Sequence, residues 1–144
     1  MSNYLPYDPG SPPTHPAPAR GETIVLKLSG LPPTKDRRQS IRNQKHPRHS
    51  TFTALRKSAE VAMAGRACYF GPVELHLTIF GPNSHERRSL NEYLGGIMDT
   101  LDGSSGQTFT YLPVVFQDDC QVAEAHTEWV EKPKCSYRLK IIFK

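Results

Sequence analysis

The clearest structural signal in this 144-residue chain is SLNEYLGGIMDTL, residues 89–101, followed after a Gly- and Ser-rich connector by LPVVFQDDCQV, residues 112–122. The apolar residues of the first segment recur at spacings of four, three and four: Leu90, Leu94, Ile97 and Leu101. That is the period of one face of an α-helix. Ser89 and Glu92 have the spacing of a capping box, and Asp102-Gly103 is a typical helix stop. The sequence therefore predicts a helix that ends at Leu101.

Two consecutive glycines, Gly95 and Gly96, lie inside this predicted helix, on the face opposite the apolar stripe. Each glycine costs a helix interior about 1 kcal/mol relative to alanine. We therefore expect a neighbouring element or a ligand to approach the helix backbone closely at this point.

The segments outside this helix predict a small sheet and a second helix. Alternating or β-branched runs predict strands at residues 22–28, 72–80, 121–130 and 137–143, and a short apolar strand at 114–116. Ser50 or Thr51 is expected to cap a helix that runs to about residue 64. The last two strands flank residues 131–134, which suggests a closing hairpin. The predicted fold class is α/β (α+β), a small mixed sheet with two helices packed on it.

Composition divides the chain into two regions. Residues 1–21 are rich in proline, which favours an extended, flexible tail, and residues 22–144 are expected to form one domain. The tail is interpreted as a disordered leader or as a ligand for a partner protein. No apolar run approaches 18 residues and no signal-peptide core is visible, so we expect no membrane association and a cytoplasmic location.

The most basic stretch is residues 35–49, within a chain whose formal net charge is +4. Its functional interpretation is an arm that contacts nucleic-acid phosphates, and the alternative is a solvated loop. A second basic group precedes the central helix. The candidate DNA-binding residues are Arg37, Arg38, Arg42, Lys45, Arg87 and Arg88.

The central segment resembles the RusA-like family of Holliday-junction resolvases. The resemblance rests on Asp99-Thr100-Leu101 with its Gly103 turn and on Asp118-Asp119-Cys120-Gln121-Val122. Residues 28–33, LSGLPP, are similar to the family's first strand and its Pro-Pro loop. The resemblance implies a RusA-like domain that pairs as a homodimer, binds branched DNA and hydrolyses phosphodiesters with Mg²⁺.

The catalytic positions of that family are mostly changed here. The family places Asp-x-Asp-Asn at the helix start, a Lys one turn later, and metal-binding Asp in the Asp-Asp pair. The first four positions fall on Ser89, Asn91, Glu92 and Gly95. The resemblance therefore implies Asp119 and Asp118 as the remaining Mg²⁺ ligands, in a degenerate site.

Three function hypotheses remain open. In the first, a rearranged site of Asp119, Asp118 and Glu92, with Asn91 as an auxiliary ligand, keeps nuclease activity. In the second, which the missing carboxylates favour, the protein keeps the fold and the basic surface but has lost cleavage, and it binds branched DNA or a protein partner instead. In the third, the chain is a non-catalytic protein-interaction module recruited through its Pro-rich tail.

Overall fold

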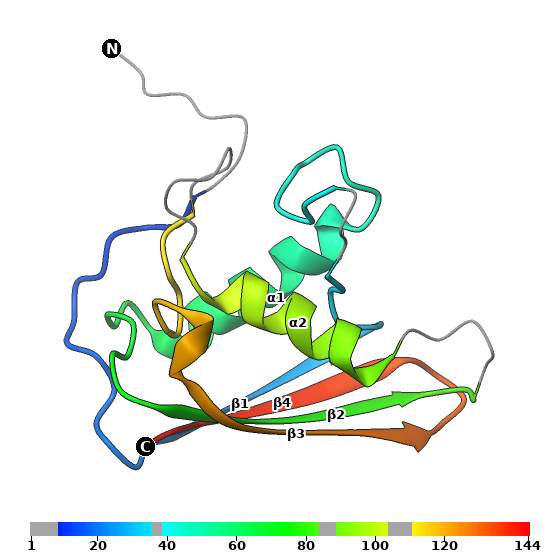
Figure 1. Ribbon diagram of the computed structural model, residues 1–144. Coiled ribbons are helices and arrows are strands. Elements are labelled where there is room, and N and C mark those ends of the chain that lie inside the picture. The colour runs from blue at the N-terminus through cyan, green and yellow to red at the C-terminus, as the bar shows by residue number, and fades with distance from the viewer. Residues whose placement is uncertain (1–8, 36–38, 84–88, 104–110) are drawn as a thin grey trace.

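The computed structural model describes residues 9–35, 39–83, 89–103 and 111–144, and it shows one four-stranded mixed sheet with two helices on one face (Figure 1). The elements, in chain order, are β1 (Thr23–Ser29), α1 (His49–Met63), β2 (Val73–Gly81), α2 (Leu90–Leu101), the 3₁₀ turn η1 (Asp119–Gln121), β3 (Val122–Glu131) and β4 (Ser136–Phe143). The predicted fold class, a mixed sheet with two packed helices, is confirmed. In the described residues, no helix is long and apolar enough to cross a membrane.

The strand order is β1-β4-β2-β3, which differs from the predicted closing hairpin. β4 lies between β1 and β2 and is antiparallel to both, whereas β3 pairs in parallel with β2. Parallel neighbours need a crossover connection, and α2 supplies it. β4 alternates buried apolar residues and so takes a central place, while β3 is mostly exposed, as is common at a sheet edge.

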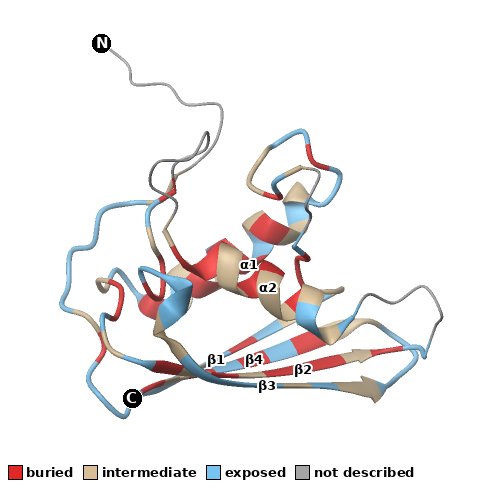
Figure 2. Cartoon of the chain, in the orientation of Figure 1, coloured by how far each residue is buried: buried red, intermediate tan, exposed pale blue. Residues whose placement is uncertain are grey.

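The core fills the space between the helices and one face of the sheet (Figure 2). On β2, Leu75, Leu77 and Ile79 are buried under the helices. Glu74 and His76, in the alternate positions, lie on the opposite face, as the alternation predicts. The second face of the sheet is therefore open.

The N-cap predicted for α2 is correct, and the N-cap predicted for α1 is not. Ser89 Oγ accepts a hydrogen bond from the backbone N–H of Glu92, which confirms Ser89 as the N-cap of α2. The prediction that Ser50 or Thr51 caps α1 is wrong, because the N-cap is Arg48, two or three residues earlier, with no side-chain cap bond. Thr51 instead donates its hydroxyl to the Arg48 carbonyl.

The close approach expected at the glycines of α2 is confirmed. The backbone of Pro33 and Thr34 passes so near Gly96 that a Cβ there would lie 2.1 Å from the Pro33 carbonyl oxygen. A neighbouring loop, which follows β1, is thus the element that requires glycine.

The predicted short strand at residues 114–116 is wrong as a strand. This segment is buried, at Val114, Val115 and Phe116. Among the described residues, its pairing with another strand-like segment is limited to one isolated bridge between Phe116 and Tyr69. The backbone N–H groups of Val114 and Val115 donate instead to the carbonyl of Leu101, at the end of α2.

The described part of the Pro-rich segment, residues 9–21, lies against the domain. The backbone N–H groups of Thr14 and His15 donate to the Gly65 carbonyl, and the Pro9 carbonyl accepts from Leu112. The Pro9 carbonyl also accepts from the guanidinium of Arg56. This part of the segment was predicted to be flexible. The bonds involve the carbonyl of Pro9 and the N–H groups of Thr14 and His15, backbone groups that need partners wherever water does not reach them.

Candidate functional site

The Asp118-Asp119 pair lies where the chain turns into β3. A regular strand would point the two side chains to opposite faces, but here Asp118 is the N-cap of η1 and Asp119 is its first residue. The Asp118 carboxylate accepts from the backbone N–H of Cys120 at 2.9 Å. Hydrogen bonds from Cys120 lower the pKa of Asp118. Both residues are exposed, so the turn presents two carboxylates to solvent.

The side chain of Gln121 holds this turn in place. Its Oε1 atom accepts from the backbone N–H groups of Gln117 (2.9 Å) and Asp118 (3.1 Å). Its Nε2 atom donates to the carbonyls of Tyr69 (2.7 Å) and Gly71 (2.9 Å). One amide therefore ties the aspartate pair to the segment that leads into β2.

Two further acids, Asp99 and Asp102, join the pair from the end of α2. Burial raises the pKa of Asp99. The nearby cations Arg42 and Lys35 act against this rise, and the negative charge of Asp119 adds to it. Burial also raises the pKa of Asp102 to about 7, against the effect of Arg42 and with help from Asp99, Asp119 and Asp118. Asp119 acts electrostatically on both acids and Asp118 on Asp102, and we call Asp99, Asp102, Asp118 and Asp119 together the carboxylate group. Among the described residues, this group does not bring its oxygens close enough together to form a metal-ligand cluster.

Arg42 binds this carboxylate group from the basic segment. Its Nη2 atom donates to Asp102 Oδ1 at 2.8 Å and to the Asp99 carbonyl at 2.6 Å. The segment is also anchored by Ile41, which forms a small second core with Phe52 and Tyr111. The structure describes residue 35 and residues 39–49 of the predicted arm, and Ile41 and Arg42 attach the second of these parts to the domain.

Lys35 adds a second cation along α2. Its backbone N–H donates to the Glu92 carbonyl, and its side chain passes over Gly95, where a Cβ would lie 3.3 Å from Lys35 Cδ. Gly95 is the position onto which the family's helix lysine falls. A lysine from another segment thus covers that position.

The predicted residues Asn91 and Glu92 lie in the first turn of α2, at the other end of the helix. Asn91 and Asp102 are eleven positions apart, which is a rise of about 16 Å along an α-helix. Figure 1 shows η1 beside the last turn of α2 and not beside the first. The structure therefore groups Asp118 and Asp119 with Asp99 and Asp102, two residues that we had interpreted only as part of the family motif and as a helix stop.

The predicted DNA-binding residues have three different placements. Arg42 is half-buried in its ion pair with Asp102, with 15% of its side chain exposed. Lys45 is exposed. The remaining four lie outside the described residues: Arg37, Arg38, Arg87 and Arg88.

A second cluster, not found from the sequence, lies on the open face of the sheet. Ligand atoms of Glu74, His76 and His126 all lie within 4.8 Å of one another, a group that could hold a metal ion. We had interpreted His76 as an ordinary exposed histidine. The available signal was the Glu-x-His alternation in β2, but the contribution of His126 depends on the β2–β3 register.

Comparison with known proteins adds no further identification. No protein-family model matches the chain, and no curated protein matches it at a significant level.

Proposed function

We propose that this protein binds branched DNA, as its resemblance to RusA-like resolvases implies, and that its Mg²⁺-dependent phosphodiester hydrolysis is reduced or lost. The observation that carries the proposal is the Arg42–Asp102 ion pair. It joins the basic segment to the carboxylate group, although the two are far apart in sequence. A phosphodiester substrate needs both kinds of group in one place, cations for its phosphates and carboxylates for a metal ion.

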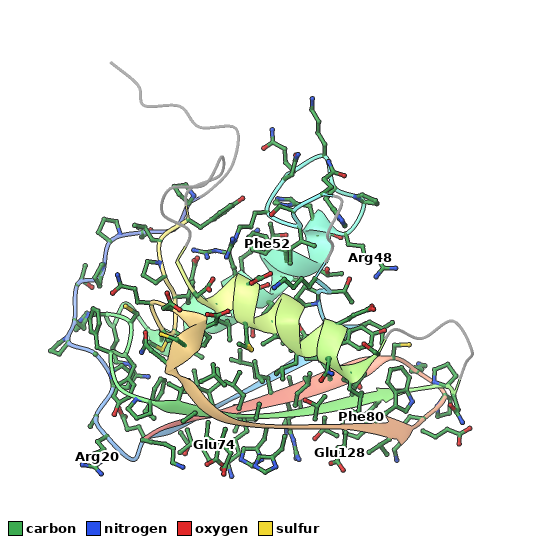
Figure 3. The ribbon with its side chains drawn as sticks, in the orientation of Figure 1. Arg20, Arg48, Phe52, Glu74, Phe80 and Glu128 are labelled. Carbon is green, nitrogen blue, oxygen red and sulfur yellow. The ribbon has the colours of Figure 1, made fainter. Side chains whose placement is uncertain are left out.

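The exposed cations of the basic segment support contact with phosphate. Lys45 and Arg48 are exposed on the basic segment, and Lys35 is exposed beside α2. Arg48 donates to Thr34 at 3.1 Å, which fixes part of its side chain and leaves it at the surface (Figure 3). We propose that these cations complement Arg37, Arg38, Arg87 and Arg88.

The raised pKa of Asp102 and its ion pair with Arg42 are our reason to expect weak hydrolysis. Mg²⁺ prefers anionic oxygen ligands in a near-octahedral arrangement. Asp102 has a pKa of about 7 and is engaged by Arg42, so near neutral pH it offers Mg²⁺ little negative charge. Asp118 and Asp119 are then the main ligands available, which is fewer carboxylates than a tightly held Mg²⁺ requires.

A gel-retardation assay with a four-way junction and a linear duplex of equal length tests the binding. We expect tighter binding to the junction and a steep loss of affinity with rising salt, because each neutralised phosphate releases counterions. Alanine at Arg37, Arg38, Arg87 and Arg88 should abolish retention. A charge-matched variant replaces four exposed lysines elsewhere: Lys27, Lys132, Lys134 and Lys140. If this control loses affinity equally, net charge explains the binding and the proposed interface is wrong.

Incubation of the junction with Mg²⁺ or Mn²⁺ tests the reaction. We expect slow cleavage or none, and any true cleavage should disappear in Asp119→Asn. Cleavage that survives this substitution comes from a contaminant or from other residues. Rapid cleavage that Asp119→Asn abolishes would show an active nuclease and would overturn the proposed loss.

The structure gives less support to a module recruited through the Pro-rich tail. Residues 9–21 are hydrogen-bonded to their own domain at Thr14, His15 and Pro9, so this part is less available to a partner. Partner binding through the tail would depend little on salt and would end on deletion of residues 1–21. Pairing of two copies, which the resemblance also implies, is measured by sedimentation equilibrium.

A further inference from the structure

The open face of the sheet carries a group of side chains that the proposed function does not use. Glu74 and His76 alternate along β2 and so point to the same side, away from the helices. Figure 3 shows Glu74 and Glu128 on this side of the sheet. The carboxylate group described above lies on the other side, with α2 and η1 (Figure 1).

The parallel pairing of β2 with β3 brings a second histidine to this place. His126 is directly opposite His76 in the register, and Glu124 is opposite Glu74. The two imidazole rings stack with centroids 4.6 Å apart and an interplanar angle of 12°. His76 Nε2 contacts Glu74 Oε2, and His126 Nε2 lies 3.5 Å from Glu124 Oε2. Two neighbouring strands thus concentrate two imidazoles and two carboxylates at one point.

The Glu74 carboxylate is held by two neighbouring side chains. One oxygen of the Glu74 carboxylate contacts His76 Nε2. The Glu74 side chain is 13% exposed, and Lys144 Nζ lies 3.1 Å from its other oxygen. The carboxylate is therefore already oriented beside the two imidazoles.

We propose that Glu74, His76 and His126 form a binding site for Zn²⁺ or a chemically similar divalent transition metal. Imidazole ligands favour Zn²⁺, Cu²⁺, Ni²⁺ and Fe²⁺, whereas Mg²⁺ and Ca²⁺ prefer oxygen ligands. Three protein ligands leave a fourth tetrahedral position for water or for Glu124, as in zinc sites that are not purely structural. This ligand set is distinct from the aspartates proposed for Mg²⁺.

Small side-chain movements are sufficient to form the site. Zn²⁺ bonds to nitrogen and oxygen are about 2.0–2.2 Å long, so two ligand atoms of a tetrahedral site lie about 3.5 Å apart. The ligand atoms here already lie within 4.8 Å of one another. The His76 and His126 side chains are 37% and 58% exposed, so an ion can reach both imidazoles from solvent.

Calorimetric titration of ZnCl₂ into the full-length, chelator-treated protein tests the site. We expect one Zn²⁺ per chain with micromolar or tighter affinity. His76→Ala and His126→Ala should each weaken binding about 100-fold or more, because even loss of an outer-shell partner costs about 10–100-fold. Glu74→Gln should weaken it about tenfold or more. His15→Ala, which removes an exposed histidine elsewhere, should leave the affinity unchanged.

Two measurements keep the outcome unambiguous. Cys120 is exposed and close to Asp118, so it is the main competing ligand among the described residues. The absorption spectrum of the Co²⁺-loaded protein should lack the charge-transfer band of a cobalt–thiolate bond. Circular dichroism should show that the histidine variants fold. Absence of binding to the wild type, or full binding to a folded His76→Ala/His126→Ala double variant, would overturn the proposal. Junction binding by His126→Ala would be unaffected in either case.

Discussion

Gly95 and Gly96 are adjacent in α2 but have different neighbours, and this difference can be measured. A Cβ on Gly96 would meet the backbone of Pro33, which has no flexible end to move, at 2.1 Å. A Cβ on Gly95 would meet the side chain of Lys35 at 3.3 Å, and that side chain can shift. The same substitution therefore has opposite consequences at the two sites.

We predict that Gly96→Ala lowers the free energy of unfolding by about 3 kcal/mol, because the loop after β1 must move away from the helix. Gly95→Ala is the matched control. It should leave stability unchanged or raise it by up to about 1 kcal/mol, since alanine is the better helix former. Urea denaturation measures both. Equal destabilisation of the two variants would show that the helix, and not the loop contact, sets the cost.

The raised pKa of Asp102 leads to a prediction of how the free energy of unfolding changes with pH. Its pKa is about 7 in the folded protein and 3.8 as the reference for the unfolded chain. Between these values the folded state binds more protons than the unfolded state, so stability falls as pH rises from about 4 to about 7. The shift of about three units corresponds to about 4 kcal/mol at most, at about 1.4 kcal/mol per unit.

Thermal unfolding at pH 5, 6, 7 and 8 checks this prediction, with Asp102→Asn as the comparison. The comparison concerns the slopes, because Asp102→Asn also removes the ion pair with Arg42. We expect the melting temperature of the wild type to fall more steeply between pH 5 and pH 7 than that of the variant. Parallel curves for the two proteins would mean that the Arg42 guanidinium keeps Asp102 ionised.

At the scale of the elements, η1 depends on one side chain. Gln121 makes four hydrogen bonds to backbone groups, and these fix the turn that carries Asp118 and Asp119. We predict that Gln121→Ala lowers the free energy of unfolding by about 2–3 kcal/mol, since each such bond contributes about 0.5–1.5 kcal/mol. Gln117→Ala, at a neighbouring exposed position, should have little effect. Urea denaturation of both variants provides the measurement, and equal stability would argue against this role for Gln121.

The elements themselves were largely predictable from the sequence. The period of the apolar residues located α2, with Ser89 as its cap, and the alternation located β2. These signals are local, because each element must turn one face toward the core. The Asp118-Asp119 turn was not predictable in the same way. Its geometry is set by hydrogen bonds from Gln121 to Tyr69 and Gly71, about fifty residues away.

The strand order was the other failure, and it has the same cause. A hairpin between β3 and β4 is the simplest connection for consecutive strands. The chain instead places the more apolar β4 in the middle of the sheet and leaves β3 at the edge, a choice that depends on packing of the whole core. The cluster of Glu74, His76 and His126 follows from that order and could not be found without it.

At the scale of the whole molecule, the described part of the Pro-rich segment is part of the structure. Arg56 is 4% exposed, and its guanidinium donates to the carbonyls of Pro9 (3.2 Å), Leu112 (2.8 Å) and Thr100 (3.3 Å). It also lies 4.9 Å from the ring centroid of Tyr111. Removal of Pro9 would take one acceptor from a buried cation.

We predict that deletion of residues 1–21 lowers the free energy of unfolding by about 2 kcal/mol, because the bonds of Pro9, Thr14 and His15 are lost. Deletion of residues 1–8 keeps every one of these bonds and should have a smaller effect. Denaturant titration of the two truncated proteins measures the difference. Equal stability of the full chain and of the protein that lacks residues 1–21 would show that the whole segment is a flexible tail.

The parallel pairing of β2 with β3 has a consequence for the order of events during folding. His76 and His126 become neighbours when α2 has crossed the sheet and the edge strand has docked, which closes a long loop. An ion that needs both imidazoles would therefore bind a refolding chain only after β3 has paired with β2. If Co²⁺ is present from the start of refolding, the absorption of the bound ion would develop only once β3 has paired with β2.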